Sequence, residues 1–171
     1  TSGGGVINLA GGTLNGVTVN SGITITAVGG TLQDTTISSG AAVNFTAGQT
    51  GTISGTIINN GTLSAIGGSN TNTNLRMGAN STLTGSGVVT LGSSSNVYTG
   101  YIGSASSGYT LTNQSTIQGN GYIGREIPSQ FNYNTINSGT INASDSGKSL
   151  ILFGNVANTG TLSASNGGTL Y

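Results

Sequence analysis

The chain has 171 residues, no net charge, only six charged side chains, and neither cysteine nor histidine. This composition excludes zinc, haem and iron–sulfur sites, and it excludes catalytic dyads or triads built on Cys or His. Three basic residues are too few to follow a phosphate backbone, so we expect no nucleic-acid partner. No apolar run approaches the length of a membrane span, so we expect no membrane insertion.

Glycine, threonine, serine and asparagine together make up about 60% of the chain. These residues are mediocre or poor helix formers. Charge is too scarce and β-branched residues are too frequent for a typical disordered chain, and glycine does not recur at every third position as in collagen. The composition therefore favours strands and tight turns. The chain opens without a basic or apolar leader, so we expect a mature or excised segment.

A short phrase, Gly/Ser-Thr-Ile/Leu-polar, recurs along the chain. Its threonines are Thr13, Thr31, Thr52, Thr62, Thr82, Thr116, Thr140 and Thr161. Their spacing gives a loose period of about 21 residues, as expected for a repeat architecture. The short step from Thr52 to Thr62 indicates a move to another face within one turn. The period predicts an all-β, single-stranded parallel β-helix (a β-solenoid) of roughly eight rungs, with the threonines stacked in an outward ladder.

Within each phrase the side chains alternate, so we expect the aliphatic residue to point inward and the threonine outward. Other expected inward residues are Val17, Val19, Ile23, Ile25, Val43, Phe45, Ile57, Leu91, Leu111, Ile151 and Phe153. Four copies of the phrase begin with asparagine: Asn59, Asn113, Asn137 and Asn158. We predict that these asparagines, together with Gly61, Gly139 and Gly160, form the turns, because Asn tolerates the left-handed conformation and Gly adopts positive φ freely.

Three stretches interrupt the repeat, at residues 67–74, 92–108 and 124–133, and we predict them to be loop excursions from one domain spanning residues 1–171. Five of the six tyrosines gather in or near them: Tyr98, Tyr101, Tyr109, Tyr122 and Tyr133. Aromatic side chains on Gly/Ser-rich loops are candidates for contact with sugars or protein partners. Equally, they can cover loop backbone against the rod. The sequence leaves both interpretations open.

The repeats resemble those of a known class of proteins. Residues 111–124 (LTNQSTIQGNGYIG), 137–143 (NSGTINA) and 158–170 (NTGTLSASNGGTL) are similar to the β-helical repeats of large secreted bacterial surface proteins, namely autotransporter passengers and filamentous-haemagglutinin-like adhesins. The resemblance is close over residues 108–170 and compositional over residues 6–91. It implies a location outside the cell or on its surface, and a scaffold or adhesive role without enzymatic activity.

Chemical motifs are few. The pattern Gly-x-Gly-x-x-Gly at residues 119–124 matches the dinucleotide-binding fingerprint, but no helix pattern follows it, so we expect a turn and no cofactor. The carboxylates Asp34, Glu126 and Asp145 are far apart in sequence, although one period brings Glu126 near Asp145. We expect Lys148 to form an exposed ion pair with Asp145. We therefore predict no enzyme, no catalytic residues and no metal site.

Two functional hypotheses follow, from different classes. The leading one is an extracellular structural scaffold that associates with itself end to end or forms part of a longer surface rod, because uncapped solenoids end in open strand edges and zero net charge removes repulsion. The alternative is an adhesin segment that binds glycan or a host or neighbouring cell surface through the tyrosine-rich loops. A minor alternative is an ice-binding face, suggested by irregularly spaced Thr-x-Thr triplets such as Thr24/Thr26 and Thr82/Thr84.

Overall fold

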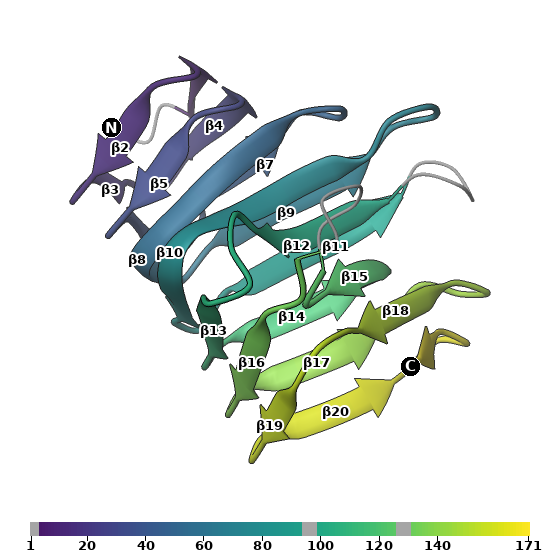
Figure 1. Cartoon of the computed structure of the whole chain (residues 1–171). Helices are drawn as coiled ribbons and strands as arrows, with labels where there is room; N and C mark the ends of the chain where they lie inside the picture. Colours follow the sequence, from purple (N-terminus) through teal and green to yellow (C-terminus); the bar gives the residue numbers. More distant parts are fainter. Residues whose placement is uncertain (1–3, 94–98, 126–130) are drawn as a thin grey trace.

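The computed structural model describes residues 4–93, 99–125 and 131–171. Within these ranges the chain forms short β-strands and turns without a helix, and therefore without a helix that is long and apolar enough to cross a membrane. All strand pairs are parallel, and the chain winds as a coil whose successive turns lie against one another (Figure 1). The predicted parallel β-solenoid is confirmed.

One side of the coil, here called side A, is a sheet of eight parallel strands. Strands that are neighbours in this sheet are separated along the chain by one or two strands that belong to the other sides. Its strands, in spatial order, are β1 (Gly5–Ala10), β4 (Ile23–Val28), β7 (Ala42–Phe45), β9 (Thr62–Gly67), β11 (Val88–Ser93), β14 (Thr116–Gly119), β17 (Thr140–Ala143) and β20 (Thr161–Ala164). Between two passes along side A, the chain forms the other two sides.

The other two sides are the arms of one bent sheet of 13 strands. Side B consists of β2 (Thr13–Asn15), β5 (Thr31–Gln33), the first halves of β8 (Thr50–Asn59) and β10 (Thr73–Thr84), β12 (Gly100–Ser104), β15 (Gly121–Ile123), β18 (Ser149–Leu152) and β21 (Thr169–Leu170). Side C consists of β3 (Thr18–Val19), β6 (Thr36–Ile37), the second halves of β8 and β10, β13 (Thr110–Asn113), β16 (Asn134–Asn137) and β19 (Val156–Asn158). In β10 a register shift between Met77 and Ser81 marks the bend.

The length of one turn varies along the coil. On side A, Thr24 pairs with Ala42, whereas Val88 pairs with Thr116, so the second of these turns contains a much longer stretch of chain than the first. The period expected from the sequence is matched near the C-terminus, where Thr140 pairs with Thr161. The turns lengthen where the connections between strands are long, as at residues 68–72 between β9 and β10 and 105–109 between β12 and β13, so the repeat is a geometric one and tolerates insertions at its corners.

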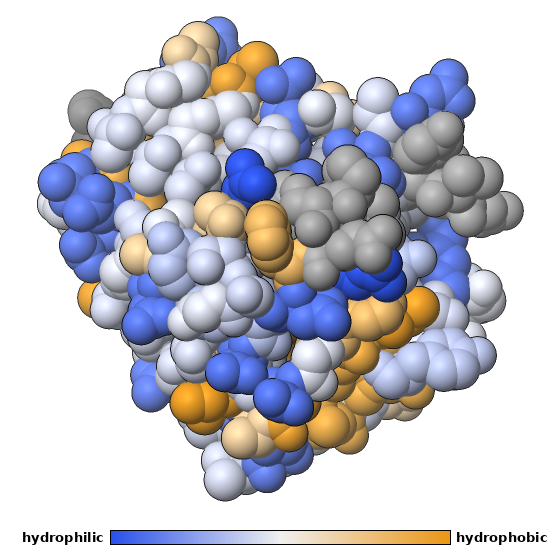
Figure 2. Space-filling model, in the orientation of Figure 1, coloured by the Kyte–Doolittle hydropathy of each residue, from blue (hydrophilic) through white to orange (hydrophobic). Residues whose placement is uncertain are grey.

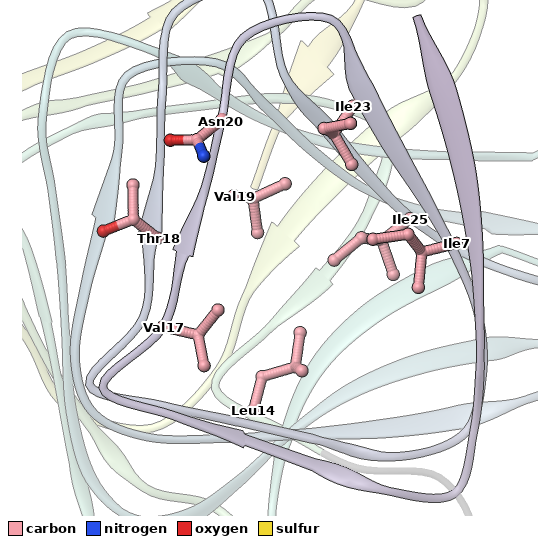
Figure 3. Close-up of a pocket in the computed structure, with 8 residues that line it drawn as sticks. All are labelled: Ile7, Leu14, Val17, Thr18, Val19, Asn20, Ile23 and Ile25. Atoms are coloured by element: carbon pink, nitrogen blue, oxygen red, sulfur yellow. The ribbon is translucent and has the colours of Figure 1, made fainter.

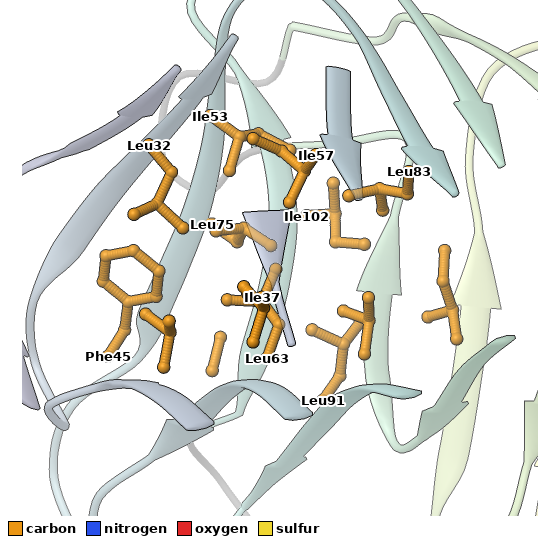
Figure 4. Packing of buried hydrophobic residues seen from close by; sticks show 14 of the residues in the cluster. Leu32, Ile37, Phe45, Ile53, Ile57, Leu63, Leu75, Leu83, Leu91 and Ile102 are labelled. Atoms are coloured by element: carbon orange, nitrogen blue, oxygen red, sulfur yellow. The ribbon is translucent and has the colours of Figure 1, made fainter. Parts of the chain in front are cut away.

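The core is a narrow column of aliphatic side chains that point inward from all three sides (Figure 4). On side A the paired inward residues are Ile7, Ile25, Val43, Leu63, Val89, Ile117, Ile141 and Leu162. Leu63 is fully buried, whereas Ile7 is 50% exposed and Leu162 is 40% exposed at the two ends. Each turn therefore depends on its neighbours to bury its apolar residues.

A second inward column on side A shows how a large side chain is accommodated by small residues next to it and across the core. Phe45 lies between Ala27 and Ala65 along this column, so the large ring has small neighbours above and below. Across the core, a Cβ atom on Gly51 would overlap the ring of Phe45, at 1.7 Å from Cε1. Gly51 is therefore the residue that makes room for the only phenylalanine in the described core.

Some sequence-based placements are wrong. Ile151 points outward and pairs with Tyr122, and Phe153 packs its ring on Tyr122, while Leu150 is the buried residue. The run 150–153 is apolar at every position, so alternation could not decide which residues face the core. Val17 agrees with its predicted inward placement, since it lines the apolar pocket at the open first turn, where it is 38% exposed.

The predicted excursion at 92–108 is not a single loop, because strand β12 (residues 100–104) lies inside it and pairs with β10 and β15. Of the excursion at 67–74, residues 68–72 connect β9 to β10. Residues 94–98 and 126–130, in two of the predicted excursions, lie outside the described residues.

Replacing a core residue should destabilise the coil far more than replacing its outward neighbour. We expect Leu63→Ala to lower the free energy of unfolding by about 2–5 kcal/mol, because it opens a cavity in the fully buried column. Thr62→Ala, at the adjacent exposed position, should change it by less than about 0.5 kcal/mol. Urea titrations of the unaltered protein and the two variants measure both values, and equal losses would contradict the assigned inward register.

Candidate functional site

The predicted turn residues all lie at one corner, between side C and side A. Asn59, Asn113, Asn137 and Asn158 end side C strands, and Gly61, Gly139 and Gly160 precede side A strands. None of these seven residues has positive φ, in contrast to the expectation from sequence. The glycines are needed because the neighbouring turn passes close by: a Cβ on Gly139 would lie 2.1 Å from the carbonyl oxygen of Ser115.

Three of these asparagines, Asn113, Asn137 and Asn158, form a hydrogen-bonded ladder along the coil. Asn113 Nδ2 donates to Asn137 Oδ1 (2.7 Å), and Asn137 Nδ2 donates to Asn158 Oδ1 (2.6 Å). Asn113 and Asn137 are fully buried. Each of these two amides also donates to the backbone carbonyl two residues further along the chain, on Ser115 (3.1 Å) and Gly139 (3.3 Å) respectively. The ladder thus supplies hydrogen-bond partners to the buried side-chain amides of successive turns.

The ladder begins only in the middle of the coil. In the first turns the position of Asn59 is held by Val19 and Ile37, which pair in register with each other and then with Asn59, whereas Asn113 pairs in register with Leu83. At the turn after Asn59 no side-chain amide follows, and Asn59 Nδ2 donates instead to the carbonyl oxygen of Val88 (2.9 Å). Gly85 lies close beside it, since a Cβ there would be 2.4 Å from the carbonyl oxygen of Asn59. The corner therefore changes from apolar to amide chemistry along the chain.

Removing one side-chain amide from the ladder should lower the free energy of unfolding more than removing one from the surface. Asn137→Ala removes the side-chain acceptor of the Asn113 amide inside the core, so we expect the free energy of unfolding to fall by about 3 kcal/mol. Asn134→Ala, which loses only an exposed bond from Asn155 (3.2 Å), should cost less than about 1 kcal/mol. Thermal and urea unfolding compare the two variants, and similar losses would show that the ladder adds nothing beyond burial.

The predicted threonine ladder divides among the three sides. Thr13, Thr31 and Thr52 stack on side B, and the next residue in that column is Arg76. Thr82 lies on side C, paired with Thr56 and Thr112. The remaining four, Thr62, Thr116, Thr140 and Thr161, share one outward column on side A. The short step from Thr52 to Thr62 is the move from side B to side A.

Side A presents two outward columns without a charged residue. The first holds Val6, Thr24, Ala42, Thr62, Val88, Thr116, Thr140 and Thr161, so that every position carries a methyl group. The second holds Asn8, Thr26, Asn44, Ser64, Thr90, Gln118, Asn142 and Ser163. Its members hydrogen-bond between turns, as Ser64 does to Asn44 (2.7 Å) and Ser163 to Asn142 (3.1 Å). Side A is therefore a neutral, hydrogen-bonding surface.

The described tyrosines are mostly part of the coil. Tyr101 and Tyr122 lie in strands β12 and β15, and their rings stack with centroids 5.0 Å apart. Tyr122 stacks in turn on Phe153 (5.7 Å), and Arg125 lies over the Phe153 ring at 5.1 Å from its centroid. Tyr109 is half-buried against the core, and Tyr98 lies outside the described residues. Ring faces that stack on one another along the coil are not available to a sugar.

Tyr133 is buried in the core, where its hydroxyl donates to the carbonyl oxygen of Ile102 (2.6 Å). Burial raises the pKa of the Tyr133 hydroxyl far above its ordinary value of 10, and the backbone of Gly124 lowers it only in part. Burial, and then the charge of Tyr122, raise the pKa of Tyr101 to about 12. Both hydroxyls are therefore held in their neutral form by the fold.

These raised pKa values predict a loss of stability in alkali. The unfolded chain releases its phenolic protons near pH 10, whereas the folded chain retains those of Tyr101 and Tyr133 to higher pH, so the free energy of unfolding should fall between about pH 10 and pH 12. Tyr133→Phe should be less stable by about 1 kcal/mol at neutral pH, because it loses the bond to Ile102, yet fall less steeply in alkali. Urea midpoints against pH measure this, with Tyr171→Phe as the exposed control.

The charged groups do not converge on a site in the described part of the chain. The predicted ion pair between Lys148 and Asp145 does not form: Lys148 Nζ donates to the carbonyl oxygen of Ser93 (2.9 Å), and Lys148 and Asp145 share only the backbone bond from Lys148 N to Asp145 O (3.1 Å). Asp34 accepts from the backbone N–H of Thr56 (2.9 Å) at an exposed corner, with its own φ at 47°. Glu126 lies outside the described residues. No group of three potential metal ligands occurs among the residues with described positions. The glycine pattern at 119–124 spans β14 and β15 without a helix.

The N-terminal end of the coil is an open apolar pocket of about 300 Å³ (Figure 3). It is lined by Ile7, Leu14, Val17, Thr18, Val19, Asn20, Ile23 and Ile25, which belong to the first turn and the strand that follows it. The C-terminal end also exposes apolar groups, with Leu162 at 40% and Tyr171 at 70%. In Figure 2 apolar side chains gather near this end, over the last strands. Among the residues with described positions, both ends of the coil thus present apolar surface beside unpaired strand edges.

No family model matches the chain, and neither a curated protein nor a solved structure matches it. The geometry of the coil and its surface chemistry are therefore the grounds for a functional proposal.

Proposed function

We propose that the protein is a non-enzymatic structural scaffold outside the cell, a segment of a rod that is continued at its ends by rungs of the same kind. A second copy of this chain or further chain can supply those rungs. The observation that carries the proposal is that both ends of the coil are open: Ile7 and Leu162, the terminal members of the inward column on side A, are half-exposed. Open parallel edges with apolar residues favour the addition of another strand.

The two open edges on side A are complementary to each other. When β20 of one copy pairs with β1 of the next, Leu162 lies over Ile7 in the core column and Ser163 lies over Asn8 in the outward column. These are the combinations found inside the coil, where aliphatic residues stack and serine hydrogen-bonds to asparagine. The absence of net charge leaves no long-range repulsion between copies.

The finer description of the rod belongs to the same proposal. We propose about eight rungs for the chain, as the threonine spacing predicts and as the eight strands of side A support. The resemblance of residues 108–170 to the repeats of autotransporter passengers and filamentous-haemagglutinin-like adhesins supports a place on a bacterial surface. The sparse carboxylates and the missing Cys and His support a role without catalysis.

The alternatives retain narrower support. For an adhesin segment, Tyr122 and Phe153 are partly exposed and Phe131 is 41% exposed, so a glycan or cell surface could meet their ring edges on side B. For an ice-binding face, the methyl-bearing column of side A stands beside a column of hydrogen-bonding groups, with Thr24 and Thr26 on one strand. Both hypotheses stay predictions, and the open ends favour the scaffold.

Charge placed in the core column at the ends should abolish association. We expect the unaltered protein to form rods that lengthen with concentration, and the double variant Ile7→Lys, Leu162→Lys to associate at least about hundredfold more weakly, because the joint would bury two unpaired ammonium groups. Electron microscopy and light scattering measure rod length and mass.

The matched control adds the same charge on the outward positions of the same strands, with Asn8→Lys and Thr161→Lys. This control should still form rods. Short monomers of the unaltered protein at every concentration, or equal behaviour of the two double variants, would contradict end-to-end stacking.

A further inference from the structure

We propose that the C-terminal end of the coil selects the rung that follows it: it accepts a rung that carries asparagine at the level of the ladder, in the phrase Asn-x-Gly/Ser-Thr-Ile/Leu. The partner is thus a β-solenoid rung of defined corner chemistry. This inference rests on the proposed function, since it assumes that further rungs stack on this end, and it adds which rungs fit.

The ladder has a direction, and it ends on an amide that donates one hydrogen bond where the preceding amide donates three. Asn137 Nδ2 donates to three oxygens: Gly139 O within its own turn (3.3 Å), and Asn158 Oδ1 (2.6 Å) and Thr161 O (3.4 Å) on the following turn. Asn158 Nδ2 makes only the first kind of bond, to Gly160 O (3.1 Å). The described residues supply neither a next side-chain oxygen nor a next strand carbonyl.

Adding a rung would change the surroundings of this amide. Asn137 is fully buried beneath the turn that follows it, whereas Asn158 is exposed. A further rung paired with β19 and β20 would cover Asn158 in the same way that the last turn, with Asn158 and β20, covers Asn137. Covering Asn158 Nδ2 without a side-chain oxygen on the next rung would weaken docking by about tenfold or more, whereas an asparagine at that level offers its Oδ1.

The first turns of this chain do not offer the matching group. Their residues at this corner are Val19 and Ile37, which are buried and apolar. Where the coil itself lacks a following asparagine, after Asn59, the amide reaches the carbonyl of Val88 beside Gly85, which has no side chain. A branched aliphatic residue would instead place methyl groups against the amide. The matched joint is therefore with a rung of the asparagine type.

An extended chain tests the selection. Because Leu150 pairs with Leu170, a second copy of residues 152–171 appended after Tyr171 continues the register and places the copied asparagine over Asn158. Four extended chains form a double-mutant cycle: asparagine or valine at the copied position, each combined with Asn158 or Asn158→Val. The unextended chain and its Asn158→Val variant give the baseline, because this substitution also removes the acceptor of Asn137.

Hydrogen exchange of the appended backbone amides is the measurement. We expect protection at least about tenfold greater with the Asn–Asn pair than with valine over Asn158, and recovery of protection with the Val–Val pair. Equal protection in all four chains would overturn the selection while leaving rung stacking intact. An appended rung without protection in any chain would contradict the stacking on which the proposed function depends.

Discussion

The whole molecule depends on one constraint: a single turn of this coil cannot bury its own apolar residues. Each turn brings only a few aliphatic side chains inward, and these are covered when the next turn lies directly above in parallel register. Leu63, in the middle of its column, is fully buried, while the chemically equivalent Ile7 at the end is half-exposed. Stability is thus a property of neighbouring turns, and every other feature either keeps them close or fills the space between them.

The corner glycines and the asparagine ladder serve this close approach. Gly139 and Gly160 allow the backbone of one turn to pass against the carbonyl oxygens of the preceding turn. The asparagines then satisfy one another inside the gap that remains. An amide in this position contributes hydrogen bonds along the coil that an aliphatic residue lacks, and it ties consecutive turns to one register. The cost is that the ladder needs a partner at its final level.

Much of the fold was predictable from the sequence because the phrase repeats with strict alternation. Thr62, Leu63 and Ser64 alternate outward, inward and outward as their types require. The direction of residues 150–153 was not predictable, since an apolar run carries no alternation and the sheet alone decides which residues face inward. The long strand β10 was not predictable either, because Gly78 and Asn80, which favour a break between strands, lie inside it at the bend from side B to side C.

The candidate site was less accessible to sequence reasoning. The asparagines were found from their position in the phrase, but local turn chemistry suggested left-handed backbone where the structure has a buried ladder. The distinguishing signal was present: Asn113, Asn137 and Asn158 recur at nearly one period, which is what stacking of like on like requires. The prediction for the tyrosines failed in another way: their clustering in the sequence suggested exposed loops, whereas Tyr101 and Tyr122 lie in regular strands.

The neutrality of side A has a consequence for the setting in which such a rod could work. Its outward columns contain no group that ionises in ordinary water, so its interactions are neither screened by salt nor changed by moderate acid. Methyl groups, hydroxyls and amides keep the same character in fresh and saline media. A surface of this composition offers any neighbour the same contacts wherever the ionic strength fluctuates.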